Sequence, residues 1–273
     1  MGSGIAEVAA RAGCRVRVHE QSEELVEAGR RRVEASLERA LRADKLSADE
    51  RDEALERLEY ATELSELSDR QLVIEAVVEN EAAKFEVFRA LDAALSDPDA
   101  ILASNTSSIP IMKLAAQTGR PERVCGLHFF NPVPVLRLVE LIRSLATSDD
   151  TATRLEEFAR ERLGRVVIHA PDRAGFVVNA LLVPYLLSAI RMLESGFASA
   201  EDIDTGMVHG CSHPIGPLRL CDLIGLDTVR AVADSMFEEY REPLYAPPPL
   251  LSRTVEAGRL GRKTGRGFYD YAK

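Results

Sequence analysis

Short apolar segments alternate with amphipathic helices over the first two-thirds of the chain, and this alternation restricts the fold more than any other feature. Residues 71–78 are apolar almost throughout, which is typical of a strand buried on both faces of a parallel sheet. Repeated strand–helix units predict such a sheet with helices on both faces. The other predicted strands are 14–20, 100–103, 124–129, 138–142 and 166–169. Helices are predicted over 5–12, 81–95 and 151–163. Two further helices are predicted between 22 and 58: Ser22 caps the first, and the second opens at the capping box 47–50 and runs through Leu58.

The pattern changes after the segment 172–175. Residues 176–194 are predicted to form a helix that is apolar almost all round, and a helix of this kind is buried on several sides. Further helices are expected over about 200–209, 217–240 and 249–257. We therefore expect an α/β fold in two domains, a Rossmann-like parallel-sheet domain over 1–170 and an all-helical C-terminal domain over 171–273.

The charge balance and the cysteines exclude several classes of protein. Asp and Glu number 44 against 34 Lys and Arg, and the net charge of -10 argues against nucleic-acid binding. No stretch reaches the roughly 20 apolar residues of a membrane span, and we expect no secretory signal. The four cysteines lack metal-like spacing. We therefore expect no metal site and no disulfide, and reduced thiols of this kind indicate a cytoplasmic protein.

The first residues look like the end of a dinucleotide-binding turn. In that turn a Gly-x-Gly-x-x-Gly segment follows a first strand, and an acid about 20 residues later binds the adenosine ribose. Gly2 fits the third glycine, and Glu20, at the end of the next predicted strand, fits the ribose acid. We expect the first strand and the first two glycines to precede Met1. The alternative is that the N-terminal Gly-Ser-Gly segment is merely flexible.

Six motifs together carry a resemblance to a known family. They are Ser104-Asn-Thr-Ser-Ser108, Gly126-Leu-His-Phe-Phe-Asn-Pro-Val133, Val139-Glu140, Asp172-Arg-Ala-Gly-Phe-Val-Val-Asn179, His213-Pro-Ile-Gly-Pro217 and Lys263-Thr-Gly-Arg-Gly-Phe-Tyr269. In this order and spacing the chain closely resembles the short-chain 3-hydroxyacyl-CoA dehydrogenases, nearest to the bacterial 3-hydroxybutyryl-CoA dehydrogenases. The resemblance covers essentially the whole chain and implies an acyl-CoA substrate and a role in fatty acid metabolism.

His128 is the candidate catalytic base. Oxidation of a carbinol needs a group that takes the hydroxyl proton while hydride leaves the same carbon, and histidine titrates in the right range. Glu140 lies twelve residues later, so the two side chains meet if their strands flank a turn near Pro134. A carboxylate there would orient the imidazole and stabilise its charged form. The resemblance assigns these two positions as the catalytic pair, whereas a lone histidine would more often be a core residue.

Three polar residues match further positions of the family. By resemblance, Ser107 and Asn179 are catalytic and substrate-binding residues that hydrogen-bond near the hydroxyl and the thioester carbonyl, and Ser107 and Asn131 lie close to the nicotinamide. The structural alternatives are a turn residue for Ser107, a loop cap for Asn131 and a helix-packing amide for Asn179. The last alternative is weak, because a buried amide must find a hydrogen-bond partner.

The resemblance also places Glu79, Lys84 and Lys263 at the cofactor site, with Gly2 and Glu20. For Lys84 the alternative is an ordinary solvated helix residue. An acid at the position of Glu20 accepts hydrogen bonds from the ribose and repels a 2′-phosphate, so NAD is favoured over NADP.

Two arginines close to the ribose acid keep NADP as the less favoured cofactor. Arg15 and Arg17 lie in the same predicted strand as Glu20 and would attract a 2′-phosphate.

The helical segment 22–58 is rich in arginine for an acidic protein. It matches the helical insert that receives coenzyme A in the family, with Ser36 at a contact position. Ala43 stands where the family has a lysine one turn beyond that serine. The alternative is a solvated face whose arginines are balanced by neighbouring glutamates.

The resemblance implies an NAD-dependent dehydrogenase that interconverts (S)-3-hydroxyacyl-CoA and 3-oxoacyl-CoA, with 3-hydroxybutyryl-CoA as the expected substrate. It also implies a homodimer formed through the helical domain. Two alternatives stay open. One is a non-catalytic acyl-CoA-binding relative, favoured by the incomplete glycine turn, and the other is a sugar-acid dehydrogenase of the same superfamily, favoured by Ala43.

Overall fold

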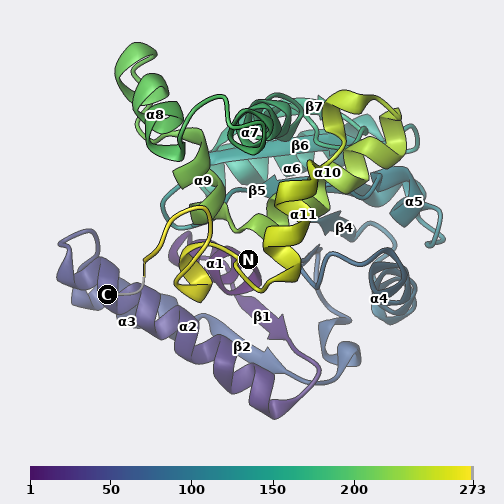
Figure 1. Cartoon of the computed structure of the whole chain (residues 1–273). Helices are drawn as coiled ribbons and strands as arrows, with labels where there is room; N and C mark the ends of the chain where they lie inside the picture. Colours follow the sequence, from purple (N-terminus) through teal and green to yellow (C-terminus); the bar gives the residue numbers. More distant parts are fainter. Residues whose placement is uncertain (272–273) are drawn as a thin grey trace. The chain divides into compact units, whose positions relative to one another are not determined.

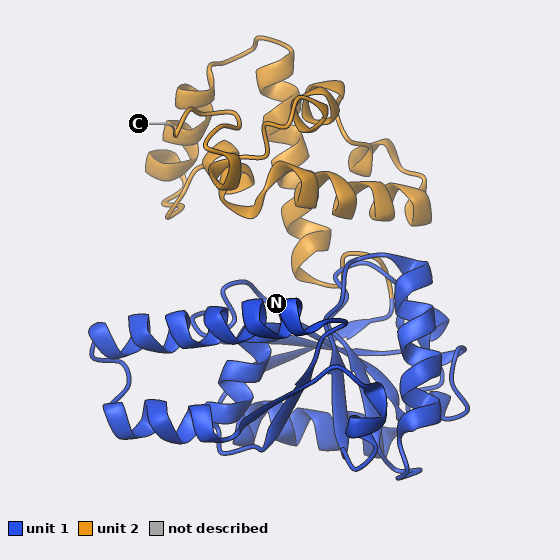
Figure 2. Cartoon of the chain, turned by 90° about the horizontal axis from the view of Figure 1, so that it is seen from below, with its two compact units in different colours: residues 1–172 blue, residues 173–273 orange. Residues whose placement is uncertain are grey.

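The computed structural model describes residues 1–271 and separates into two compact units, Met1–Asp172 and Arg173–Lys273. Figure 1 traces their elements along the chain, and Figure 2 colours the two units. Unit 1 contains both sheets and unit 2 contains helices α7 to α11.

Unit 1 is an α/β unit. Its strands are β1 (Val16–His19), β2 (Leu58–Ala61), β3 (Leu72–Glu75), β4 (Ile101–Ser104), β5 (Val124–Phe129), β6 (Leu138–Arg143) and β7 (Val166–Pro171), and its α-helices are α1 (Gly2–Arg11), α2 (Glu23–Arg42), α3 (Ala48–Glu56), α4 (Glu81–Ala94), α5 (Ile111–Ala115) and α6 (Asp149–Glu157). The Ser22 cap and the Ser47–Glu50 capping box predicted from the sequence are both present. The predicted fold class, a Rossmann-like sheet unit followed by helices, is confirmed.

The strands form two sheets. One has the order β1-β2 and the other the order β3-β4-β5-β6-β7, and every pair is parallel except β5 with β6. Within residues 1–271, β1 and β3 each have a strand partner on one side only. The backbone groups on their other sides therefore lack the ladder hydrogen bonds of a paired strand.

Both faces of the larger sheet carry helices (Figure 1). On one face, Ile5 of α1 and Leu155 of α6 pack in the same core as Leu127 of β5. On the other face, Gly126 lets α5 approach, because a Cβ there would lie 2.9 Å from Ile111 Cδ1 and 2.8 Å from Ile142 Cβ. Side chains alternate between the faces along a strand, so His128 lies on the same face as Gly126.

Several elements of unit 1 differ from the sequence prediction; the strand predicted over 71–78, for example, ends at Glu75. The helix predicted to run through Leu58 ends at Glu56, because Leu58 begins β2 and pairs with Val16 of β1. Tertiary pairing overrides the helical pattern here. Helix α5 was not predicted, and its first amides, of Ile111 and Met112, donate to the Asp172 carboxylate.

Unit 2 is built from α7 (Val178–Glu194), α8 (Ala200–Thr205), α9 (Pro217–Ile224), α10 (Leu226–Tyr240) and α11 (Pro249–Glu256). The single helix predicted over 217–240 is wrong, because Gly225, with φ of 105°, separates α9 from α10. This backbone conformation is accessible to glycine and strained for other residues. Among residues 1–271, no helix combines the length and the apolar character needed to cross a bilayer.

Two buried aspartates fasten the segments of unit 2. The Asp204 carboxylate accepts from the amides of Leu218 and Arg219 at the start of α9 and from the Tyr269 hydroxyl. It therefore caps α9 and ties it to the last segment of the described chain.

The second aspartate, Asp222, is only 1% exposed and accepts from the amides of Phe268 and Tyr269 and from the Tyr271 hydroxyl. These bonds hold the motif Gly265–Tyr269 against α9, and Gly267 is required because a Cβ there would lie 1.9 Å from an Asp222 oxygen.

Candidate active site

His128 and Glu140 form a buried pair at the β5–β6 hairpin. The two residues are directly opposite in the antiparallel register, and His128 Nδ1 lies 2.7 Å from Glu140 Oε2. His128 is 6% exposed and Glu140 is fully buried, while the Phe130 ring packs 4.7 Å from the imidazole centroid. The contact that the hairpin interpretation predicts is therefore present. A carboxylate at Nδ1 fixes the ring orientation and directs Nε2 to proton transfer.

A second polar element, the turn Thr106-Ser107-Ser108, follows β4. The Glu79 Oε1 atom accepts from Thr106 Oγ1 at 2.5 Å, from the Ser107 and Ser108 amides at 2.9 and 3.2 Å, and from both serine hydroxyls. Burial opposes ionisation of Glu79, but the Lys84 ammonium and these hydrogen bonds outweigh it and hold the pKa of Glu79 below its ordinary value. The turn is therefore organised around an ionised carboxylate.

Lys84, the predicted cofactor residue on α4, is buried. Its side chain is 1% exposed, and Nζ lies 2.6 Å from Glu75 Oε1 and 3.3 Å from Glu79 Oε2. The alternative of an ordinary solvated lysine is wrong. In this arrangement the ammonium neutralises two carboxylates, so its influence on a ligand passes through Glu79.

Asn105 connects the turn to the histidine strand, and sequence reasoning missed it. Its Oδ1 accepts the Phe129 amide at 2.9 Å, directly after His128.

Asn131, the predicted cofactor residue, lies in the loop after β5. It is exposed and is joined to Pro132 by a cis peptide bond.

The start of α1 lies beside the ends of β1 and β3. A Cβ on Gly2 would lie 3.7 Å from the Ala76 Cβ, directly after β3. Glu20 lies close to the first turn of α1, since a Cβ on Gly29 would lie 3.9 Å from Glu20 Oε1 and 4.0 Å from Ser3 Oγ. The position of Glu20 directly after β1 suits an acid that accepts hydrogen bonds from a ribose.

Gly29 lies beside the carboxylate of Glu20. Gly29 on α2 has no side chain, and a Cβ there would lie 3.9 Å from Glu20 Oε1. Arg17 is engaged elsewhere, since its guanidinium bonds the Glu59 carboxylate and the Glu66 carbonyl. Glu20 after β1 and the glycine at the start of α1 fit a dinucleotide cofactor.

Ser36 lies on α2 beside a carboxylate of α1. Glu7 is 1% exposed, and burial raises the pKa of Glu7, while the neighbouring Ser36 hydroxyl and Arg11 oppose this effect. On the outer side of α2 is a shallow groove of about 460 Å³. It is lined by Ala28, Arg31, Arg32, Ala35 and Arg39.

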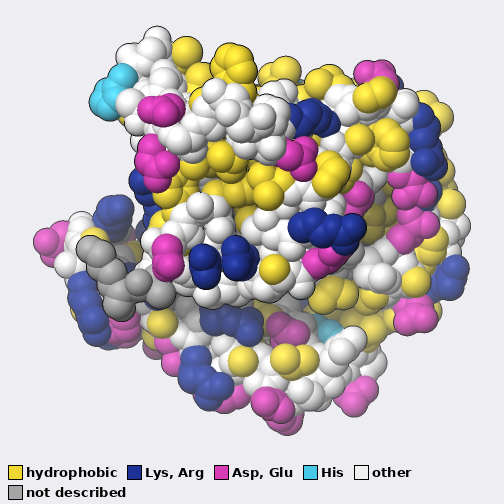
Figure 3. Space-filling view, viewed as in Figure 1, with side chains coloured by type: hydrophobic (Ala, Val, Ile, Leu, Met, Phe, Trp, Pro, Cys, Tyr) yellow, Lys and Arg dark blue, Asp and Glu magenta, His cyan; other side chains and the backbone are white. Residues whose placement is uncertain are grey.

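The groove on α2 is a local concentration of basic charge on an acidic chain. On the face drawn in Figure 3, Lys and Arg side chains are interspersed with Asp and Glu. Arg31 pairs with Glu27 at 3.5 Å, as the alternative of a balanced solvated face predicts. Three guanidinium groups nevertheless line one groove, and such a set suits a phosphorylated ligand.

Two predicted residues belong to unit 2. Asn179 is half-buried in the first turn of α7. Lys263 is 48% exposed and pairs with Asp227 at the start of α10, with Nζ 2.7 Å from Asp227 Oδ2. Their roles towards substrate and cofactor stay predictions.

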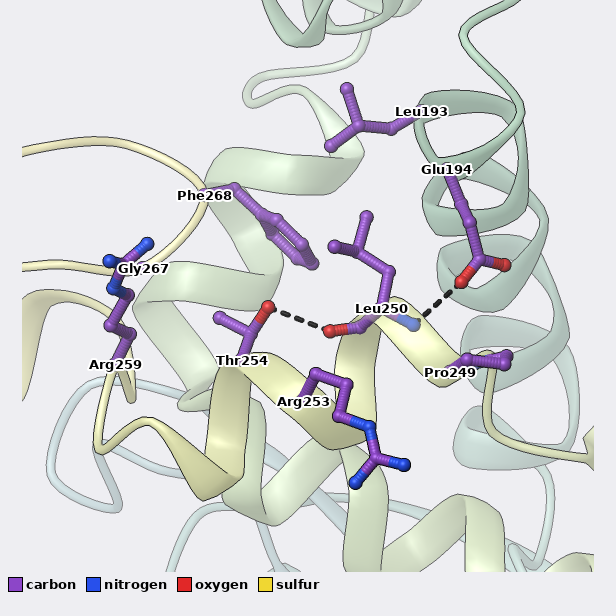
Figure 4. A pocket seen from close by; sticks show the side chains of 9 residues that line it. All are labelled: Leu193, Glu194, Pro249, Leu250, Arg253, Thr254, Arg259, Gly267 and Phe268. Carbon is purple, nitrogen blue, oxygen red and sulfur yellow. Dashed lines mark hydrogen bonds between the residues drawn. The ribbon is translucent and has the colours of Figure 1, made fainter.

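Unit 2 also has a groove, of about 560 Å³. It lies between the end of α7, helix α11 and the C-terminal segment (Figure 4). Glu194 and Leu250 meet across it through a 2.6 Å hydrogen bond. None of the predicted site residues lines it. Within residues 1–271, no group of His, Cys, Asp and Glu side chains is arranged to hold a metal ion.

Two family models cover nearly the whole chain. The NAD binding domain of 3-hydroxyacyl-CoA dehydrogenase matches residues 1–173, and the C-terminal domain of 3-hydroxyacyl-CoA dehydrogenase matches residues 175–271. The first match coincides with unit 1 and the second with unit 2 to within two residues at their common boundary.

Proteins similar to this chain include 3-hydroxybutyryl-CoA dehydrogenases. The chain is 65% identical to a 3-hydroxybutyryl-CoA dehydrogenase of Mycobacterium tuberculosis over 99% of this chain and 95% of that protein. The crystal structure of M. tuberculosis FadB2 is similar with a TM-score of 0.99 and 65% identity, covering 100% of this chain and 95% of that one. The (S)-3-hydroxybutyryl-CoA dehydrogenase PaaH1 of Ralstonia eutropha has a TM-score of 0.94 and 45% identity, with 100% and 96% covered. The chain therefore belongs to the 3-hydroxyacyl-CoA dehydrogenase family and is an oxidoreductase with a nicotinamide-binding domain.

Proposed function

We propose that this protein interconverts (S)-3-hydroxyacyl-CoA and 3-oxoacyl-CoA with NAD, and that 3-hydroxybutyryl-CoA is its substrate. The observation that carries the proposal is the buried His128–Glu140 pair with its 2.7 Å contact. The names of the similar proteins indicate the same substrate. The position of the Glu20 carboxylate directly after β1 supports NAD over NADP.

His128 moves the proton. In oxidation Nε2 accepts the proton of the 3-hydroxyl, and in reduction the imidazolium returns it to the forming alkoxide. Glu140 holds Nδ1–H and stabilises the charged ring through the proton transfer. NAD, when bound, supplies the acceptor for the hydride of the carbinol carbon. Residues Gly2, Glu20 and Glu79 would hold it, with Lys84 acting behind Glu79.

Ser107 and Asn179 would orient the substrate. The Ser107 hydroxyl belongs to the turn held by Glu79, and a fixed hydroxyl can hydrogen-bond the substrate oxygen without first being ordered. The arginine groove on α2 would bind the phosphates of coenzyme A. Ser36 lies on the same helix, directly after Ala35, which lines that groove.

A second copy of the chain would cover the exposed side of α7. Leu181 is 75% exposed and Met192 41%, and their spacing of eleven residues places them on one face of the helix. Phe197, just beyond the helix, is 80% exposed. Light scattering of the protein and of Leu181→Asp measures this directly, with a dimer expected for the first and a monomer for the second.

The function is tested by NADH oxidation with a panel of acetoacetyl-CoA, acetoacetate and a 3-keto sugar acid. Because β1 and β3 each pair on one side only, the assay uses this chain and an extended chain, in which a strand of about six residues and a Gly-x-Gly turn precede Met1. We expect turnover with acetoacetyl-CoA alone. Turnover of the sugar acid alone, or binding of acetoacetyl-CoA without NADH oxidation in either chain, would refute the proposal in favour of the respective alternative.

A further inference from the structure

A buried carboxylate outside the predicted site stands behind the substrate turn. Glu75 ends β3 and its side chain is 1% exposed. Its Oε1 lies 2.6 Å from Lys84 Nζ and accepts the Val77 amide at 2.7 Å, and its Oε2 accepts from Ser104 Oγ at 2.7 Å. Among the described residues, the backbone of Val77 and the side chains of Lys84 and Ser104 supply the hydrogen bonds of this carboxylate, so no ligand contact is needed to explain its position.

The chain of contacts continues to the turn that carries Ser107. Lys84 Nζ lies between Glu75 Oε1, at 2.6 Å, and Glu79 Oε2, at 3.3 Å. The other oxygen of Glu79 accepts from Thr106, Ser107 and Ser108. Glu75 also reaches the base of the same turn through Ser104, whose Oγ accepts the Thr106 amide at 3.2 Å.

We propose that Glu75 is a positioning residue that fixes the Ser107 turn through Lys84 and Glu79 on one side and through Ser104 on the other. The inference rests on the proposed function in one respect, since Ser107 is taken to contact the substrate. It adds a residue that motif matching did not select. Glu75 itself touches neither substrate nor cofactor in this account.

The physical basis is the sharing of one ammonium by two carboxylates. With Glu75 present, the shorter contact of Lys84 is to Glu75, and the Glu79 carboxylate stays directed at the turn amides. With Glu75 neutral, Glu79 is the remaining carboxylate partner of a buried cation, and the attraction between them strengthens. Glu79 is then drawn away from the Ser107 and Ser108 amides.

The test is Glu75→Gln, which keeps the side-chain shape and removes the charge. Hydrogen exchange of the amides of Ser107 and Ser108 is read by NMR or by mass spectrometry of the peptide that contains them. We expect exchange to become at least about tenfold faster, as for the loss of a hydrogen bond to a charged acceptor. In the more active of the two chain forms, kcat with acetoacetyl-CoA should fall about tenfold or more, because catalysis depends steeply on the placement of a substrate contact.

A matched control lies on the same helix. Asp92, further along α4 from Lys84, accepts the Gly119 amide and the Arg120 guanidinium, each at 2.7 Å. Asp92→Asn removes a structural carboxylate of comparable bonding and should lower thermal stability. We expect it to leave kcat within about twofold and the turn amides as protected as before.

The outcomes separate positioning from mere stability. If Glu75→Gln leaves the exchange of the turn unchanged, or if it lowers kcat no more than Asp92→Asn does, the inference is wrong. If Glu75→Gln does not fold, Ser104→Ala removes the hydroxyl that donates to Glu75 Oε2 and accepts the Thr106 amide, so the Ser107 and Ser108 amides, which Ser104 does not contact, are the readout. Hydrogen exchange of the Ser107 and Ser108 amides should be faster in Ser104→Ala than in the wild type. Exchange at the wild-type rate would overturn the inference. Absence of turnover in the wild type would refute the proposed function, whereas the exchange measurement still decides the role of Glu75.

Discussion

Buried carboxylates organise both units, but their partners differ. In unit 1, Glu140 faces His128 and Glu75 faces Lys84, so each carboxylate contacts a side chain that can carry a proton. In unit 2, Asp222 accepts only from backbone amides and a tyrosine hydroxyl. Neutral donors fix a geometry, whereas an ionisable partner also allows charge to move. The comparison separates carboxylates that serve chemistry from carboxylates that fasten a fold.

The largest effect on activity is expected for Glu140→Gln. Glutamine can still accept from His128 Nδ1 but does not stabilise the imidazolium, so kcat should fall by about 10²–10⁴. The free energy of unfolding should change by less than about 2 kcal/mol, because the hydrogen bond to His128 Nδ1 is kept. Steady-state kinetics and calorimetry check the two parts, and a kcat within tenfold of wild type would place Glu140 with the structural carboxylates.

For Asp222→Ala the main effect is expected on stability and not on kcat. Removal of this carboxylate leaves the Phe268 and Tyr269 amides and the Tyr271 hydroxyl without their acceptor, and the free energy of unfolding should fall by about 3–5 kcal/mol. Asp234→Ala on the exposed side of α10 is the control and should cost less than about 0.5 kcal/mol. Urea unfolding measures both, and similar losses in the two variants would contradict the fastening role.

The periodicity of the sequence predicted most of the fold. Apolar strands and amphipathic helices give a local signal, and the spacing of His128 and Glu140 about a turn gives their register in the hairpin. Features that depend on distant partners were missed. Helix α5 is capped by Asp172, some sixty residues later, and Leu58 leaves its helix to pair with β1.

Only part of the candidate site was predictable from the sequence. Side chains in distinctive motifs, such as Ser107, were found through those motifs. Glu75 and Asn105 were not selected, because their roles consist of contacts to Lys84, Ser104 and Phe129 that only the folded chain brings together. An acid in the middle of the otherwise apolar segment 71–78 is the one signal that points to Glu75 from sequence.

A smaller effect is expected for Glu20→Ala, which tests a carboxylate directed at a ligand. Loss of the ribose hydrogen bonds and of the repulsion towards a 2′-phosphate should shift the ratio of NADH to NADPH affinity by about tenfold towards NADPH. Fluorescence titration with both cofactors measures the ratio. Glu24→Ala, in the exposed first turn of α2, is the control, and an unchanged ratio in Glu20→Ala would remove the ribose role.

The smallest effect concerns pH and unit 2. Burial, and then the bond to Asp204, raise the pKa of Tyr269 above its ordinary value of 10.0. A folded-state pKa above the unfolded one means that the stabilisation is complete below pH 10 and is lost as the pH rises further. Tyr269→Phe should cost about 1 kcal/mol at pH 8, and the difference from wild type should shrink above pH 10. Denaturation curves at both pH values check this, and a constant difference would argue against the shift.

The most direct test of the central claim is NADH oxidation with acetoacetyl-CoA by the wild type and by His128→Ala, each as this chain and as the extended chain. The account predicts turnover that His128→Ala lowers by about 10³-fold or more, with NADH binding by fluorescence within about twofold of wild type. Turnover that survives in His128→Ala would contradict the assignment of the buried His128–Glu140 pair as the catalytic centre.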